Sequence, residues 1–180
     1  ELPDIDIDLA PSKRPAIFKA IREERGELGL VQVATFGTEG TKSAILTACR
    51  GYRGPGAGYK EYNNYGEELA REGIDVDVAQ YMSSLIPQER GFLWSINDVI
   101  YGNEEKGRKP IQTFINEVNK YPGLLDIIIS IEGLVNKRSS HASGVILYGK
   151  DPYETASFMR TPSGDLITSY DLHHAEAAGD

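Results

Sequence analysis

Residues 29–50, "GLVQVATFGTEGTKSAILTACR", contain the transition on which the organisation of the chain depends. Residues 29–36 alternate well enough to indicate a strand, whereas residues 42–50 have the apolar spacing of a helix. The turn "GTEGT" separates the two patterns. We therefore predict a strand that leads directly into a helix.

The residues before this strand hold a regular run of carboxylates. In "ELPDIDIDLA" (residues 1–10), Asp4, Asp6 and Asp8 stand at every second position, with aliphatic residues between them. This period of two predicts a strand with the carboxylates on one face. Like charges at that spacing repel unless a cation holds them, so the pattern suggests a divalent metal site. A solvated acidic edge strand without metal is the alternative.

Sequence patterns typical of helices and of strands alternate along the rest of the chain. Pro15 in the first turn, with Ser12 as N-cap, predicts a helix that ends at Gly26, and residues 51–66 read as a Gly- and Tyr-rich loop. Apolar stripes predict helices over residues 78–85, 92–100 and 111–118, and "LLDIIISIEGLV" favours a buried helix over a strand. Strands follow in "SGVILYG", "ASFMRT" and "LITSY", and Asp171 caps a last helix. The fold class is α/β, with a helical insertion.

Composition limits the classes of function. The chain has 180 residues, a formal net charge of −8, and 40% hydrophobic and 26% charged residues, as in a globular protein. The acidic balance argues against a surface that binds nucleic acid everywhere. No apolar run approaches the roughly 18–20 residues that span a bilayer, and a single cysteine fits a reducing cytoplasm. We expect an excised part of a larger cytoplasmic protein with no membrane contact.

Two further segments carry groups that suit phosphate. In "FGTEGTKSAIL", Lys42 and Ser43 stand where a phosphate loop would have them, but Thr41 intervenes and the glycine spacing is too short for G-x-x-x-x-G-K-[ST]. An ordinary strand–turn–helix remains an alternative to a P-loop-like NTPase using Lys42. In "NKRSSHASGVIL", Lys137, Arg138 and His141 offer charge and hydrogen bonds to phosphate oxygens, or are the solvated approach to a strand.

Taken together, "LPDIDIDL", "VQVATFGTEGTKSAI", "IEGLVNKRSSHASGVIL" and "LITSYDLHHAEAAG" resemble the bacterial C-family replicative DNA polymerases, the DNA polymerase III alpha subunit. The resemblance covers residues 2–180. It implies a partial nucleotidyltransferase-like palm, a mixed sheet with flanking helices, in residues 1–36 and 140–180. A mainly helical thumb insertion would occupy residues 37–139.

The resemblance also implies site residues and ligands. Asp4 and Asp6 match the first two catalytic carboxylates of the family, which bind Mg²⁺, with Mn²⁺ as a possible substitute. Thr38, Lys42, Lys137, Arg138 and His141 are candidates for contacts to DNA or phosphate. The implied partners are primer–template DNA, deoxynucleoside triphosphates, and a sliding clamp and other replisome subunits through the parent chain.

The family pattern is incomplete in this sequence. The third catalytic Asp, the Gly-Ser turn and the nucleotide-binding fingers of the family are absent, so we expect the chain alone to be inactive. Residues 51–66 and "YGNEEKGRKP" lengthen the implied thumb. A non-catalytic module that binds DNA or a replisome partner remains a further alternative.

Overall fold

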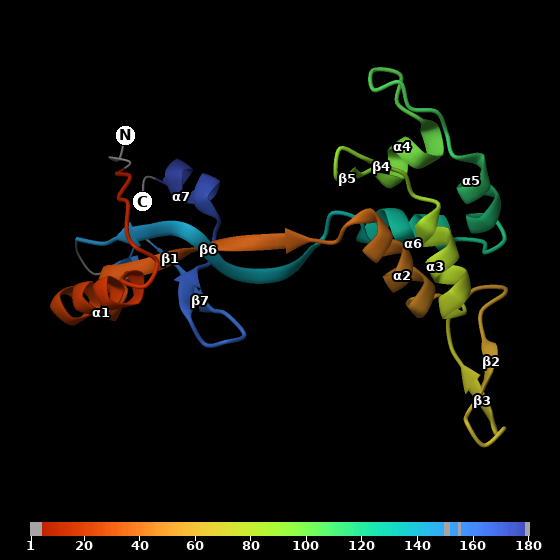
Figure 1. Cartoon of the computed structure of the whole chain (residues 1–180), viewed down its shortest axis with the longest axis horizontal. Helices are drawn as coiled ribbons and strands as arrows, with labels where there is room; N and C mark the ends of the chain where they lie inside the picture. Colours follow the sequence, from red (N-terminus) through yellow and green to blue (C-terminus); the bar gives the residue numbers. More distant parts are fainter. Residues whose placement is uncertain (1–4, 150–151, 155, 179–180) are drawn as a thin grey trace. The chain divides into compact units, whose positions relative to one another are not determined.

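The computed structural model describes residues 5–149, 152–154 and 156–178. The chain forms two compact units (Figure 1). Unit 1 takes in residues 1–37 and 136–180, and unit 2 takes in residues 38–135. The chain passes from unit 1 to unit 2 at the end of strand β1 and returns at the start of strand β6.

The described residues of unit 1 form a four-stranded sheet, two α-helices and two 3-10 turns. Its elements are α1 (Arg14–Arg25), η1 (Glu27–Gly29), β1 (Leu30–Thr38), β6 (Val135–Leu147), η2 (Pro152–Glu154), β7 (Phe158–Arg160), β8 (Leu166–Thr168) and α7 (Leu172–Ala178). Only the last residue of β1 and the first residue of β6 belong to unit 2. The strand order is β6-β1-β8-β7. β8 is parallel to β1 and antiparallel to β7. The mixed sheet confirms the α/β fold class.

Strand β1 is the central element of this sheet. Leu30, Val31, Val33 and Ala34 are all buried, so both faces of β1 are covered, and β1 has a neighbouring strand on each side. The Ala34 amide donates to the buried Thr168 hydroxyl at 3.0 Å, so this buried polar group has a partner. The strand predicted over residues 29–36 is thereby confirmed, as is the helix that follows it.

Helix α1 is confirmed, but its predicted N-cap is wrong. Pro15 lies in the first turn and Gly26, at φ 86°, ends the helix. The cap position is taken by Lys13, whose side chain makes no capping hydrogen bond, so Ser12 is not the cap. None of the residues of α1 is buried. At the other end of unit 1, the Asp171 carboxylate caps α7 by accepting from the His174 amide at 3.0 Å, as predicted.

Unit 2 is mainly helical, with two small hairpins. Its elements are α2 (Thr41–Gly51), β2 (Tyr59–Tyr62), β3 (Glu68–Arg71), α3 (Val76–Ser84), β4 (Gln88–Glu89), β5 (Phe92–Leu93), α4 (Ile96–Tyr101), α5 (Gln112–Val118) and α6 (Leu124–Ile131). One cluster of buried apolar residues from α2 to α6 forms its core. Residues 124–131 are a helix, which confirms the choice of helix over strand for that run.

Three predicted boundaries differ from the structure. Residues 59–62 of the expected loop pair with residues 68–71 in a hairpin. Phe92 and Leu93 pair with residues 88–89 in a second hairpin instead of starting a helix. The strand predicted from residue 143 begins at Val135. In the first and third cases strand pairing extends over largely polar residues whose own pattern does not indicate a strand, whereas the apolar Phe92 and Leu93 fit either a strand or a helix. Within the described segments, every helix is too short or too polar to cross a membrane.

Candidate metal and nucleic-acid site

The acidic segment does not have the predicted backbone conformation where the structure describes it. Residues 5–10 form no strand, and the predicted acidic strand is therefore wrong for these residues. Ile5 and Ile7 are 70% and 69% exposed, so no apolar face is buried. Alternation predicts which side chains share a face, but a strand also needs a neighbour for its backbone groups. Asp4 lies outside the described residues.

The carboxylates of this segment are open to solvent. Asp6 and Asp8 are both exposed, and neither forms an ion pair with a residue in the described parts of the chain. Over those same parts, no three His, Cys, Asp or Glu side chains gather in a way that could hold a metal ion. Exposed carboxylate oxygens are nevertheless the hard donors that Mg²⁺ prefers.

Three of the candidates for contacts to DNA or phosphate, Lys137, Arg138 and His141, lie on strand β6. Backbone hydrogen bonds fix the orientation of the His141 ring. The Nδ1 atom of His141 accepts from the amides of Gly144 (2.8 Å) and Ser143 (3.2 Å). Because a backbone N–H can only donate, the neutral ring carries its proton on Nε2. A Cβ on Gly144 would lie 3.1 Å from Nδ1, so glycine permits this close approach. His141 can therefore present an Nε2–H donor.

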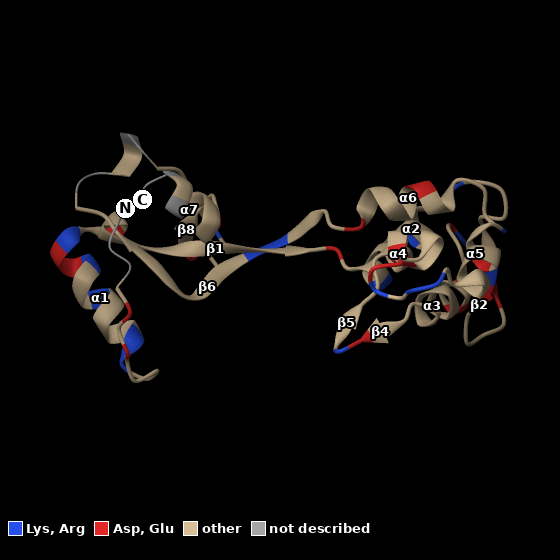
Figure 2. Cartoon of the chain, turned by 90° about the horizontal axis from the view of Figure 1, so that it is seen from above, with Lys and Arg blue, Asp and Glu red and all other residues tan. Residues whose placement is uncertain are grey.

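Lys137 and Arg138 lie on the exposed part of β6, where basic residues are visible in Figure 2. The Nε atom of Arg138 donates to the Arg160 carbonyl at 3.1 Å, which leaves its terminal nitrogens available. The stem of Lys137 lies beside Gly37, where an added Cβ would be 3.3 Å from the Lys137 Cβ. Lys137, Arg138 and His141 thus all lie on β6, with the adjacent residues Lys137 and Arg138 on opposite faces of the strand.

Thr38 and Lys42 belong to unit 2, at the turn between β1 and α2. Thr38 is exposed and Lys42 half-buried. The carboxylate of Glu39 accepts from the hydroxyls of Ser43 and Thr47, so a carboxylate of the chain already lies at this helix start. Gly40 has an extended backbone, at φ −78° and ψ 165°, without the left-handed residue that curls a backbone around an anion. This geometry does not favour a P-loop.

Glu132 holds the start of α2 against the start of α4 within unit 2. Its carboxylate accepts from the Ile96 amide at 3.0 and 3.1 Å and from the Thr41 hydroxyl at 2.5 Å. The Thr41 hydroxyl also contacts the Trp94 carbonyl at 2.8 Å. Thr41 is therefore a structural residue, which explains its place between Gly40 and Lys42.

A second charged group in unit 2 is also structural. Arg108 bonds the Asp98 carboxylate at 2.5 Å and Glu89 at 2.9 Å, and its guanidinium lies 4.8 Å from the Trp94 ring centroid. The Asn103 amide, which also bonds Asp98, and then Arg108 hold the pKa of Asp98 below its usual value. These bonds fix the loop after α4. Because the Arg108 guanidinium is paired with carboxylates of the chain, it is not available to a ligand.

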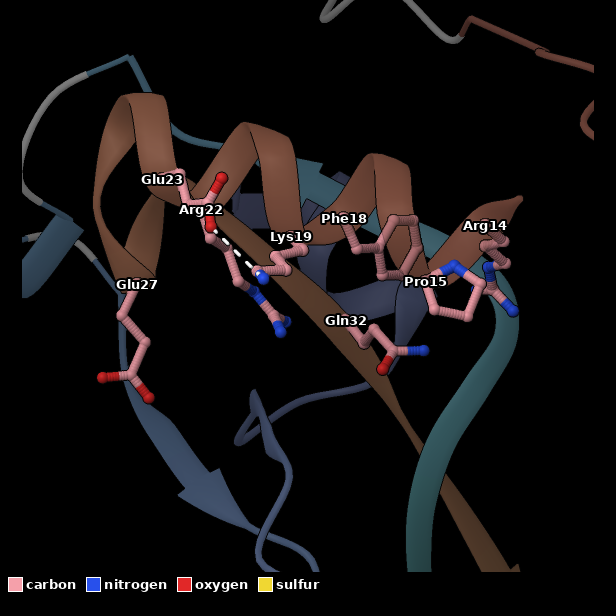
Figure 3. Close-up of a pocket in the computed structure, with 8 residues that line it drawn as sticks. All are labelled: Arg14, Pro15, Phe18, Lys19, Arg22, Glu23, Glu27 and Gln32. Atoms are coloured by element: carbon pink, nitrogen blue, oxygen red, sulfur yellow. Dashed lines mark ion pairs between the residues drawn. The ribbon is translucent and has the colours of Figure 1, made fainter. Parts of the chain in front are cut away.

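A cavity of unit 1 that has several charged lining residues was not predicted from the sequence. It lies between α1 and β1 and has a volume of about 620 Å³ (Figure 3). Arg14, Phe18 and Arg22 line it and follow one another at intervals of four residues, which places them on one face of α1. The four-residue spacing of these side chains is visible in the sequence, but the helix was predicted from Ser12, Pro15 and Gly26 and not from its charged residues.

Comparison with known proteins gives a consistent result over the whole chain. The family model described as bacterial DNA polymerase III alpha NTPase domain matches residues 1–179. The chain is 46% identical over 179 residues, 99% of its length, to a probable DNA polymerase YorL of Bacillus subtilis (strain 168) and to a DNA-directed DNA polymerase of Bacillus phage SPbeta. It is 25% identical over 178 residues to a DNA polymerase III subunit alpha of Thermus aquaticus. The chain spans 12% of the length of each of these relatives. The chain belongs to the bacterial DNA polymerase III alpha family.

Proposed function

We propose that this chain is part of a DNA-directed DNA polymerase that acts in chromosomal replication in the bacterial cytoplasm. The observation that carries the proposal is the family match over residues 1–179, together with 46% identity to proteins named as DNA polymerases. In the proposed reaction a primer 3′-hydroxyl attacks the α-phosphorus of a deoxynucleoside triphosphate, and pyrophosphate leaves. Primer–template DNA and the nucleotide are the substrates.

The two units correspond to two parts of such an enzyme in this proposal. Residues 1–36 and 140–180 are assigned to a partial palm, and residues 37–139 to a helical thumb. The mixed sheet of unit 1 and the helical character of unit 2 support this assignment. A sliding clamp and other replisome subunits would bind through the rest of a longer polypeptide.

Asp4 and Asp6 are the proposed metal ligands. The Asp6 carboxylate is exposed and is in no ion pair with the described residues, so its oxygens are available as hard donors. Two carboxylates are sufficient for Mg²⁺, or Mn²⁺ in its place, because waters and substrate phosphates supply the remaining ligands. When bound, the ions lower the pKa of the primer hydroxyl and neutralise charge on the leaving group. The role of Asp4 and Asp6 is to fix the position of these ions.

Five other residues are proposed to contact the DNA backbone or phosphate: Thr38, Lys42, Lys137, Arg138 and His141. The Nε2–H of His141 and the terminal nitrogens of Arg138 are free donors in the described structure, which supports their inclusion. Each contact would be independent of base sequence. Replacing any of the charged members should weaken duplex binding equally for all sequences and flatten its salt dependence.

The test compares three matched substitutions in a polymerase polypeptide that includes this chain. Asp4→Asn and Asp6→Asn each remove one negative charge from a proposed ligand, and Asp8→Asn removes the same charge from the next alternate position. We expect primer extension with Mg²⁺ to fall by about 10²–10³-fold or more for the first two variants and little for the third. The 180-residue chain alone should extend no primer.

Three outcomes would contradict the proposal. Robust synthesis by the isolated chain would show that the missing parts of the family pattern are not needed. Equal primer extension by all three Asn variants would show that the acidic segment binds no catalytic metal. That result would favour a non-catalytic module that only binds DNA. ATP binding that is lost in Lys42→Ala but kept in Asp4→Asn would favour an NTPase instead.

A further inference from the structure

The cavity between α1 and β1, hereafter the α1 cavity, lies entirely within unit 1. Its principal lining residues are Arg14, Phe18, Lys19, Arg22 and Glu23 of α1 and Gln32 of β1. Figure 3 shows the side chains of Phe18, Lys19 and Arg22 on the side of α1 that faces Gln32. A volume of about 620 Å³ is within the range of small-molecule sites.

The carboxylates around the α1 cavity already have partners. Glu23 pairs with Lys19 at 3.6 Å on the same helix, and Glu27 pairs with Arg160 at 3.4 Å. Across the described segments, neither Arg14 nor Arg22 is in an ion pair with a carboxylate. The cavity therefore contains two guanidinium charges that the protein leaves unneutralised.

Both guanidinium groups are held in place while part of each is left unbound. The Nε atom of Arg22 donates to the Leu30 carbonyl at 3.1 Å, which orients the group and leaves its terminal nitrogens unpaired. The guanidinium carbon of Arg14 lies 4.8 Å from the centroid of the Phe18 ring. The Nη2 atom of Arg14 is shielded from solvent and has no hydrogen-bond partner among the described residues. A shielded charged donor without a partner indicates a missing acceptor.

We infer that the α1 cavity binds phosphate groups of a nucleotide, with Arg14 and Arg22 each donating to one of them. The two guanidinium groups stand eight residues apart on one face of α1, and each can donate to two oxygens of one phosphate. Phe18 and Pro15 supply an apolar wall beside the charges, and Gln32 a neutral amide. The choice of a nucleotide over other phosphate esters rests on the proposed function, whereas the anion site itself does not.

The test measures binding to the chain by calorimetry in EDTA, with (dT)12 and with dTTP as separate ligands. The double variant Arg14→Gln/Arg22→Gln is compared with Arg25→Gln, a control that removes a charge from the same helix outside the lining of the α1 cavity. We expect at least a tenfold weaker affinity for the double variant and less than about twofold for the control. For (dT)12 the slope of log K against log salt should become shallower by about 1.4, which is 0.7 for each of two phosphates.

Each outcome either supports or overturns phosphate binding in the α1 cavity. Binding of dTTP alone makes free nucleotide the source of the phosphate, and binding of (dT)12 alone makes it a strand; both support the site. No binding by the native chain, or equal losses in the double variant and in Arg25→Gln, would overturn the inference. If the double variant unfolds, adding tripolyphosphate to the native chain should shift the Arg22 side-chain NMR signals, and unchanged signals would overturn it. Because EDTA removes divalent ions, this result is independent of the Asp4 and Asp6 test.

Discussion

The cluster of buried apolar side chains in unit 2 and helix α1 of unit 1 differ in how much of their side-chain surface is buried. The largest cluster of buried apolar residues lies entirely within unit 2 and includes Ile45, Met82, Phe114 and Ile128, each fully shielded from solvent. Helix α1 of unit 1, in contrast, buries none of its residues. Unit 2 therefore has a continuous apolar core of its own, whereas helix α1 of unit 1 adds no buried residue to a core.

The polar groups show the same contrast. In unit 2, Glu132, Asp98 and Arg108 are all engaged in hydrogen bonds that join helices and loops. In unit 1, Arg14 has a donor without a described partner, and Asp6 is exposed without a described ion pair. Glu132, Asp98 and Arg108 thus stabilise the fold of unit 2, whereas Arg14 and Asp6 of unit 1 keep polar groups available for a ligand.

The largest expected effect tests the contrast in packing. Phe114→Ala removes a fully buried ring from the core of unit 2 and should reduce its free energy of unfolding by about 3–5 kcal/mol. Phe18→Ala removes a half-buried ring from α1 and should cost less than about 1 kcal/mol. Residue-resolved hydrogen exchange in urea measures each unit separately, because two units need not unfold together.

Cys49 provides an independent measurement of the opening of unit 2. Burial raises the pKa of its thiol to about 11, so little thiolate is present at pH 8 while unit 2 is folded. Labelling by a disulfide reagent should therefore require opening, and Phe114→Ala should accelerate it by about two to four orders of magnitude, at 1.4 kcal/mol for each factor of ten. Equal labelling rates in Phe114→Ala and Phe18→Ala would contradict the contrast.

Sequence patterns predicted the elements that fold on local information. The change from strand to helix at residues 29–50, the buried helix at residues 124–131 and the Asp171 cap of α7 are all confirmed. Each depends on apolar spacing or on a cap within a few residues of the chain. The mixed α/β class was predicted from the order of these elements.

Features that depend on distant partners were not predicted. Strand β6 begins at Val135 because β1 lies beside it, although residues 136–141 are polar. The acidic residues 5–9 alternate as a strand does, but no described strand pairs with them. The α1 cavity needs Gln32 of β1 as well as the face of α1, so the helix sequence alone could not indicate it. The metal role of Asp4 and Asp6 remains a prediction.

The next expected effect is an acid dependence of unit 2. The pKa of Asp98 is lowered by the Asn103 bond and then by Arg108, so its contribution to stability is complete above its ordinary value of 3.8. As the pH falls below 3.8 the unfolded chain takes up the proton first, and this stability is lost on passing through the folded pKa. The melting temperature of unit 2 should therefore fall between pH 5 and pH 2.5.

The control for this dependence is a matched pair of arginine variants. Arg108→Gln should lower the melting temperature at pH 6 and reduce the further loss at pH 2.5, because the folded and unfolded pKa values of Asp98 move closer together. Arg53→Gln breaks a 2.6 Å ion pair with Glu72 whose side chains are 55% and 80% exposed, and it should change neither value. Identical pH profiles for Arg108→Gln and the native chain would show that Arg108 does not contribute to the dependence.

The smallest expected effects compare helix caps in the two units. The Ser95 hydroxyl caps α4 in unit 2 by accepting from the Asp98 amide at 3.2 Å, so Ser95→Ala should destabilise unit 2 by about 1 kcal/mol. Ser12 stands two residues before α1 and is exposed, and the cap position of that helix makes no side-chain hydrogen bond. Ser12→Ala should therefore change stability by less than about 0.5 kcal/mol. A larger loss for Ser12→Ala than for Ser95→Ala, measured by urea unfolding, would restore the sequence-based assignment of Ser12 as a cap. It would also show that α1 contributes more to unit 1 than its lack of buried residues indicates.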